Sequence, residues 1–278
     1  MADRRTTFGA GSPARADPLR RFYEESYERD AGIASIPSDD DFVYGQMLRL
    51  VRPGLRPSAR VLDLGCNNGN LSLYMARRVC RVTGVDLARN AIDAAVRSAK
   101  HYGIGNADFR CMDFLAEWDE PNAFDFVLCS HVVEHVPDDA SFVRKIAWAL
   151  KGGGGLVIMA PCDRSSIYRA HVLLKGRLPH DEDVGHLRRY SLRGLSALCQ
   201  GAGLSVIRRG YLDGPLRDWF ILHPRLRRFN RLWAGRYIRS VFNGLDYGLA
   251  QFLFPGAVAV HAKKTSSGGS EAASEHHR

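Results

Sequence analysis

The sequence lacks the features of a disulfide-rich, zinc-ribbon or membrane-spanning protein. None of its six cysteines forms a C-x-x-C pair, which argues against a zinc ribbon and a disulfide framework. The apolar stretch near the C-terminus covers only residues 252–260 and contains Pro255 and Gly256, whereas a bilayer span needs about 20 residues. The first residues contain no apolar signal-peptide core. These absences predict a cytoplasmic protein.

Composition and charge leave several classes of partner open. The chain has 278 residues, of which 45% are hydrophobic and 25% charged, as in an ordinary globular protein. This length predicts one large domain or two small ones. A net charge of +9 favours an anionic partner: a phosphorylated substrate, a nucleic acid or a membrane surface.

Strand-like and helix-like segments alternate along the chain. Short apolar runs predict strands over residues 60–65, 81–86, 107–111, 124–130, 156–160, 204–212 and 257–264. Amphipathic stretches predict helices over residues 19–27, 41–51, 70–79, 91–102, 138–150 and 191–201. This alternation is typical of a doubly wound parallel sheet. We therefore predict a Rossmann-like α/β fold with a seven-stranded sheet and helices on both faces.

The expected organisation has one main domain with additions. The predicted parts are a disordered tail (1–18), an N-terminal helical cap (19–58), a core (59–213), a helical basic-aromatic insertion (214–256), the last strand (257–264) and a second disordered tail (265–278).

A ligand-binding loop is predicted after the first strand. There Asp63 is followed by Gly65, Asn67 and Gly69, and glycines allow a tight turn and close approach of a ligand. Asp86 ends the second strand, where a carboxylate can accept both hydroxyls of a ribose. The G-x-G-x-x-G of dinucleotide-binding enzymes is missing.

This loop resembles motif I of class I S-adenosylmethionine-dependent methyltransferases, and the resemblance extends over residues 59–212. It implies that S-adenosylmethionine is the cofactor, with Asp86 on its ribose and Asp113 on its adenine. Asn67 departs from the family, which usually has glycine at this place. The cofactor-binding residues implied are Asp63, Gly65, Asn67, Gly69, Asp86, Leu87, Asp113, Phe114 and Ser130.

His131, Glu134 and His135 follow the fourth strand. Their H-x-x-E-H pattern occurs in a class of zinc proteases, but its position after a parallel strand does not suit that class. The spacing i, i+3, i+4 places the three on one helical face, where they could bind a divalent metal. Alternatively, His131 or His135 is a general base, or the residues cap a helix and line a pocket.

This loop resembles the corresponding loop of ubiquinone-biosynthesis O-methyltransferases and small-RNA 2′-O-methyltransferases. In those enzymes the loop has the pattern E-x-x-E-H and binds a metal. The RNA enzymes add a histidine, comparable to His186 here, and His131 replaces the first glutamate. A set of His131, Glu134, His135 and His186 would suit zinc, iron, manganese or nickel better than magnesium. The acidic-histidine run over residues 180–183 is interpreted as a solvated turn.

Residues 216–247 contain seven arginines and seven aromatic residues against two aspartates, so their net charge is +5. This segment is interpreted as a helical cap over a pocket or as a contact with an anionic membrane surface. Nucleic acid is the less favoured partner, because no RNA-binding module is visible elsewhere.

Together these features predict an S-adenosylmethionine-dependent methyltransferase that methylates an oxygen of a small-molecule acceptor, which is lipid-, quinone- or natural-product-like. The alternatives are a metal-dependent RNA 2′-O-methyltransferase and a peripheral membrane protein with vestigial catalysis. The predicted location is the cytoplasm, with peripheral attachment to the membrane as a variant.

Overall fold

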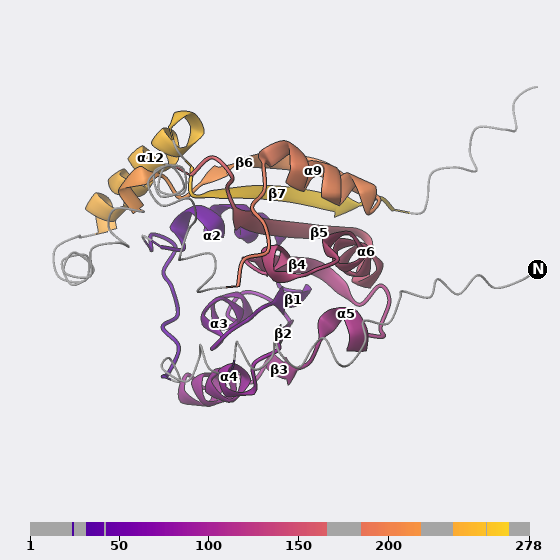
Figure 1. Cartoon of the computed structure of the whole chain (residues 1–278). Coiled ribbons are helices and arrows are strands. Elements are labelled where there is room, and N and C mark those ends of the chain that lie inside the picture. Colours follow the sequence, from indigo (N-terminus) through magenta and orange to yellow (C-terminus); the bar gives the residue numbers. More distant parts are fainter. Residues whose placement is uncertain are drawn as a thin grey trace, which may run out of the picture.

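A seven-stranded sheet forms the centre of the protein in the computed structural model (Figure 1). The structure describes residues 24, 32–41, 43–165, 185–217, 236–253 and 255–266. The order of the strands is β3-β2-β1-β4-β5-β7-β6. Their bounds are β1 Arg60–Leu64, β2 Arg81–Asp86, β3 Ala107–Cys111, β4 Phe124–Ser130, β5 Leu150–Pro161, β6 Leu204–Leu212 and β7 Ala257–Lys264. The expected tail over 1–18 lies outside the described residues.

The expectation of a parallel sheet is wrong for β7, which runs antiparallel to both β5 and β6. Leu212 at the end of β6 pairs with Ala257 at the start of β7. The chain therefore re-enters the sheet at the same end of the strands at which β6 leaves it. A parallel strand would need a crossover connection that returns the chain to the opposite end of the strands. The seven-stranded α/β architecture is confirmed, as a mixed sheet.

β5 begins earlier than expected. The strand was predicted over 156–160, but it starts at Leu150, so the glycine run over 152–155 forms part of it. The register against β4 shifts between Phe124 and Phe126, which is the mark of a bulge. Gly153 has φ 76°, and a Cβ on Gly154 would lie 2.9 Å from the Lys151 carbonyl oxygen. The glycines therefore allow a distorted strand here rather than ending one.

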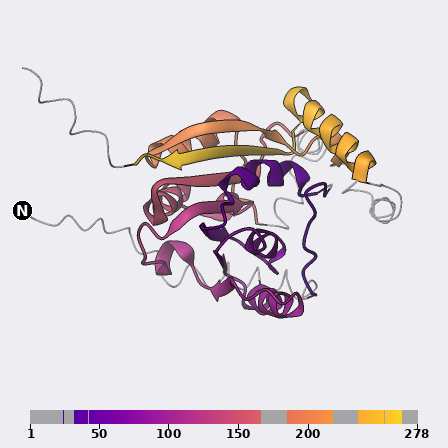
Figure 2. The same cartoon turned by 180° about the vertical axis from the view of Figure 1, so that it is seen from behind.

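Helices cover both faces of the sheet, as predicted (Figures 1 and 2). Their bounds are α2 Gly45–Val51, α3 Asn70–Ala76, α4 Arg89–His101, α5 Phe114–Glu117, α6 Asp139–Ala149, α9 Leu192–Gly201 and α12 Arg236–Phe252, with single 3-10 turns η1 Arg52–Gly54 and η2 Val133–His135. Two helices are shorter than predicted: α2 begins at Gly45 and α3 ends at Ala76. Of the expected helix over 19–27, only residue 24 is described.

Alternating strand residues divide the core between the two faces. Leu62 and Ile158 pack with the residues of α5, α6 and α9. Val61, Val157 and Met159 pack on the opposite face with those of α2 and α3. Because both faces are buried, the central strands are apolar along nearly their whole length. This packing fixes the carboxyl ends of β1, β2 and β4, which carry the candidate site.

Candidate functional site

The loop after β1 has the backbone geometry of a ligand cradle. Gly65 has φ 68° and Gly69 has φ 90°, a region that favours glycine. A Cβ on Gly65 would lie 2.3 Å from Cγ2 of Val132. Asn67 also has a positive φ, of 50°, which asparagine adopts more readily than most residues. Asparagine at the family's glycine position is therefore compatible with the turn.

Asp86 is fixed directly beside this loop. Its Oδ2 accepts a hydrogen bond of 2.9 Å from the Asn67 amide, and its Oδ1 accepts one of 3.0 Å from the Ala88 amide. Burial raises the pKa of this carboxyl, and the amide donors oppose that shift. Each oxygen retains acceptor capacity for a further hydroxyl donor.

Asp63 lies beneath the loop, with only 2% of its surface exposed. The Ser72 hydroxyl donates a hydrogen bond of 2.5 Å to its Oδ2, which connects β1 to the first turn of α3. Burial raises the pKa of Asp63 to about 7, and the nearby charge of Asp86 adds to the shift. The structure therefore gives Asp63 a supporting place below the cradle.

Two buried acceptors at the same loop were not identified from the sequence. The Oδ1 atoms of Asn68 and Asn70 are buried and have no hydrogen-bond partner. The Asn70 amide donates to the Tyr44 hydroxyl at 3.3 Å, so α2 also borders the loop. Unsatisfied buried acceptors are costly unless a ligand pairs with them. A cradle with two such acceptors fits the ammonium group of S-adenosylmethionine. In the sequence, the only sign of these acceptors is the presence of short polar residues beside the glycines.

The remaining predicted cofactor residues fall at different places. Asp113 caps α5, because its Oδ1 accepts from the amides of Leu115 and Ala116. Phe114 is buried in the core beside Phe142, with ring centroids 5.9 Å apart. Leu87 follows β2, and Ser130 is the last residue of β4.

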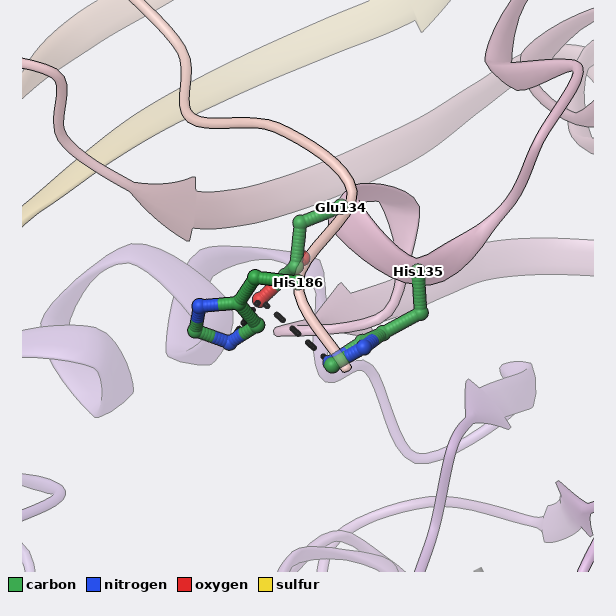
Figure 3. A group of neighbouring side chains, drawn as sticks. All are labelled: Glu134, His135 and His186. Atoms are coloured by element: carbon green, nitrogen blue, oxygen red, sulfur yellow. Dashed lines mark ion pairs between the residues drawn. The ribbon is translucent and has the colours of Figure 1, made fainter. Parts of the chain in front are cut away.

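A buried carboxylate is the centre of the second cluster, which follows β4. Glu134 lies in η2 with its side chain fully buried, and neither of its oxygens has a hydrogen-bond partner. Its Oε1 is 3.9 Å from Nε2 of both His135 and His186 (Figure 3). The ligand atoms of these three residues all lie within 4.8 Å of one another. They form the one metal-ligand group found among the residues that the structure describes.

His186 reaches this cluster because its segment is bound to the loop after β4. The Leu187 amide donates to the Glu134 carbonyl at 2.9 Å, and the Tyr190 amide donates to the Pro161 carbonyl at 2.9 Å. Nδ1 of His135 lies 3.1 Å from the Gly185 carbonyl oxygen. Because a carbonyl only accepts, it favours the tautomer with hydrogen on Nδ1 and a lone pair on Nε2, toward Glu134 and His186.

His131 contacts the same carboxylate but does not belong to this group. Its Nδ1 is 3.3 Å from Oε1 of Glu134, and its side chain is 41% exposed. Desolvation would lower the pKa of His131, but Glu134 outweighs it and raises the pKa. Desolvation would raise the pKa of Glu134, but the neighbouring histidines hold it below its usual value. The structure therefore unites Glu134, His135 and His186 and leaves His131 as an ion-pair partner at the edge.

The outlying candidate segments are described only in part. Residues 180–183, interpreted above as a solvated turn, lie outside the described residues. Of the basic-aromatic segment over 216–247, the structure describes residues 216–217 and 236–247. No described helix is both long and apolar enough to cross a bilayer.

Comparisons with known proteins agree with this geometry. The methyltransferase domain family matches residues 42–209. A ubiquinone biosynthesis O-methyltransferase of Paracidovorax citrulli is 42% identical over 180 residues, which cover 61% of this chain and 74% of that protein. The enzyme of the same name from Chromobacterium violaceum is 33% identical over 170 residues, or 55% of this chain and 71% of that protein.

Solved structures share the fold at low identity. A Haemonchus contortus phosphoethanolamine N-methyltransferase 2 in complex with S-adenosylmethionine has a TM-score of 0.58 at 20% identity, over 80% of this chain and 53% of that chain. The [4+2]-cyclase SpnF has a TM-score of 0.55 at 19% identity, over 84% of this chain and 99% of that chain. Since a cyclase shares the fold, the family assignment depends on the sequence matches rather than on the fold. By these matches, the chain belongs to the methyltransferase domain family and is a class I S-adenosylmethionine-dependent methyltransferase.

Proposed function

We propose that this methyltransferase transfers the methyl group to a hydroxyl oxygen of a lipid-, quinone- or natural-product-like small molecule. The observation that carries the proposal is the buried carboxylate of Glu134, which has no hydrogen-bond partner and faces His135 and His186 beside the end of β4. The relatives' name, ubiquinone biosynthesis O-methyltransferase, supports oxygen as the acceptor atom and a small molecule as the acceptor.

The cofactor would lie across the carboxyl ends of β1 and β2. Gly65, Asn67 and Gly69 would shape the cradle for its amino-acid part, whose ammonium group would donate to Asn68 and Asn70. The remaining contacts would come from Asp86 on the ribose hydroxyls, Asp113 on the adenine, and Leu87 and Ser130 beside them. In this proposal Asp63 and Phe114 support the site without touching the cofactor, which is what their burial favours.

Glu134, His135 and His186 would hold a divalent metal. A buried carboxylate without a hydrogen-bond partner, beside two imidazoles, is a suitable donor set, and nitrogen donors favour zinc, iron, manganese or nickel over magnesium. The ligand atoms of tetrahedral zinc lie about 3.4 Å apart. The observed separations, 3.9 Å from Glu134 to each histidine and up to 4.8 Å within the group, would therefore have to shorten on binding. A bound metal would lower the pKa of the acceptor hydroxyl and orient it.

His131 would take the hydroxyl proton. Glu134 faces its Nδ1, which leaves Nε2 for the acceptor, and a carboxylate behind an imidazole fixes the ring and strengthens it as a base. The acceptor oxygen would then form a bond to the methyl carbon while the carbon–sulfur bond breaks. S-adenosylhomocysteine leaves with the electron pair of that bond. Most of the acceleration would come from orientation of the two reactants.

The experiment is a methyl-transfer assay with labelled S-adenosylmethionine and a panel of catechols, phenols and short RNAs. We expect label on a catechol or phenol in the wild type, and a loss of at least 100-fold in Glu134→Gln. Unchanged transfer in Glu134→Gln would contradict the proposed role of the carboxylate.

RNA 2′-O-methylation is the second candidate, because His186 reaches the cluster as the resemblance to the RNA enzymes implies. Label on RNA alone, with strongly salt-dependent binding, would replace the first candidate by this one.

A further inference from the structure

His186 is the one member of the metal-ligand group that lies outside the named helices and strands. Glu134 and His135 lie in η2, whereas residues 185–191 form no named helix or strand. A ligand on an irregular segment keeps its position only if surrounding residues fix that segment. The contacts of residues 187–191 with the rest of the protein therefore determine how firmly His186 faces Glu134.

Asp139, the first residue of α6, holds this segment through two of the segment's side chains. Its Oδ2 accepts a hydrogen bond of 2.7 Å from the Tyr190 hydroxyl and forms an ion pair of 2.8 Å with Nη1 of Arg188. Nη2 of Arg188 donates a further hydrogen bond of 2.8 Å to the Pro137 carbonyl. Hydrogen bonds to an ionised carboxylate are shorter and stronger than those between neutral groups. We call Asp139, Arg188 and Tyr190 the α6 clamp.

Tyr190 is the buried member of the α6 clamp. It is 7% exposed and belongs to the same hydrophobic cluster as Phe142 and Leu195. Burial raises the pKa of its hydroxyl, and the hydrogen bond to Asp139 adds to this shift, so the hydroxyl stays protonated and can donate. The side chains of Arg188 and Asp139 are 31% and 23% exposed, and ion pairs near the surface contribute little to stability. We therefore expect the hydroxyl bond to be the stronger of the two contacts.

The α6 clamp joins the two segments that supply the three metal ligands. Asp139 comes shortly after η2, which ends at His135, and Arg188 comes two positions after His186. The hydrogen bond between Tyr190 and Asp139 spans 51 positions of the chain. Removing residues that orient the ligands of a metal site without touching the ion typically lowers metal affinity about 10- to 100-fold. The α6 clamp has the connections expected of such residues.

We propose that Asp139 is a positioning residue of the metal centre, which uses the α6 clamp to keep His186 opposite Glu134. This role rests on the proposed function, since it requires that the metal-ligand group binds an ion. Asp139 does not belong to that group and supplies no ligand. Loss of the α6 clamp would leave His186 free to move away from the carboxylate, which lies 3.9 Å from its Nε2. The ion would then lose one of its three protein ligands.

The alternative role of Asp139 is to stabilise α6, because acidic residues in the first turn interact favourably with the helix dipole. The neighbouring Asp138 provides the comparison. Its side chain caps the same helix by accepting a hydrogen bond of 2.9 Å from the Ser141 amide. No hydrogen bond or ion pair connects Asp138 to the described residues of the 185–191 segment. Substituting each aspartate in turn therefore separates the effect of the clamp from that of the helix terminus.

The test is the zinc affinity of the full chain, measured by competition with a chromophoric chelator. The test variant is Asp139→Ala, and the matched control is Asp138→Ala. We expect Asp139→Ala to bind zinc about 10- to 100-fold more weakly than the wild type, and the control to remain within about threefold. Asp139→Asn, whose amide oxygen can still accept from Tyr190, should lose less affinity than Asp139→Ala. S-adenosylmethionine affinity and metal-free stability should be the same in Asp139→Ala as in the control.

Two results would overturn the positioning role alone: wild-type zinc affinity in Asp139→Ala, and an equal loss of affinity in the Asp138→Ala control. A wild type that binds no zinc would overturn the metal centre as well, so a failure of the proposed function is distinguishable from a failure of the clamp. If Asp139→Ala does not fold, Tyr190→Phe replaces it, because this change removes one contact of the clamp and leaves the ring in the core. Wild-type zinc affinity in Tyr190→Phe would then contradict the proposal.

Discussion

Replacing Asp63 by asparagine should stabilise the protein at neutral pH. Burial raises the pKa of this carboxyl from 3.8 to about 7, so the folded protein holds a proton there that the unfolded chain releases above about pH 4. A raised carboxyl pKa makes the free energy of unfolding fall as pH rises between these two values. Asparagine has no proton to lose, and its amide oxygen can still accept from Ser72.

The size of the effect follows from linkage. With pKa values of 3.8 unfolded and about 7 folded, the carboxyl costs about 1.7 kcal/mol at pH 5 and about 4.2 kcal/mol at pH 7.5. The stability of Asp63→Asn relative to wild type should therefore rise by about 2.5 kcal/mol between these pH values. Taking the difference between two pH values removes the pH-independent effects of the substitution.

Urea denaturation followed by circular dichroism at both pH values measures this difference. Asp108→Asn, at a more exposed carboxylate on β3, is the control and should change by less than about 0.5 kcal/mol. If Asp63→Asn shows no more pH dependence than the control, the inferred protonation of Asp63 is wrong. A loss of S-adenosylmethionine binding in Asp63→Asn would contradict the supporting place assigned to it.

The cofactor site gives two further expected outcomes. Asp86→Ala should weaken S-adenosylmethionine binding in isothermal titration by at least tenfold, because it removes the proposed ribose acceptor and frees the Asn67 amide; wild-type affinity in this variant would refute that role. Phe114→Ala should destabilise the protein by about 3 kcal/mol in urea denaturation, because it empties a core position beside Phe142; a variant that loses cofactor affinity but no stability would instead place Phe114 at the cofactor.

The central strands were predictable because they are buried on both faces: β2, β4 and β7 are largely apolar between turn residues and have the predicted bounds. The edge strands β3 and β6 also have the predicted bounds, although they are only partly buried. The predicted start of β5 was wrong because the glycines before residue 156 lie within a bulged strand. The direction of β7 was also missed, because it depends on the end of the strands at which the chain re-enters the sheet.

The candidate site was predictable where it is local. Gly65, Asp86 and the 131–135 loop are close to strand ends in the sequence, so their convergence follows from the topology. The approach of His186 to Glu134 depends on hydrogen bonds of the 185–190 segment, which no periodicity shows; the family resemblance supplied that expectation. The burial of Phe114 beside Phe142 was not predicted, because the four-residue helix that Asp113 starts is too short for a periodic pattern.

The metal content of the purified protein tests the central proposal most directly. After incubation with zinc or manganese and removal of the excess, elemental analysis should find about one metal ion per chain in the wild type and in His101→Ala, a control at an exposed histidine of α4. His186→Ala, which removes one of the three ligands, should retain less than about a tenth of that amount. No metal in the wild type, or equal metal in His186→Ala, would contradict a metal centre at Glu134, His135 and His186.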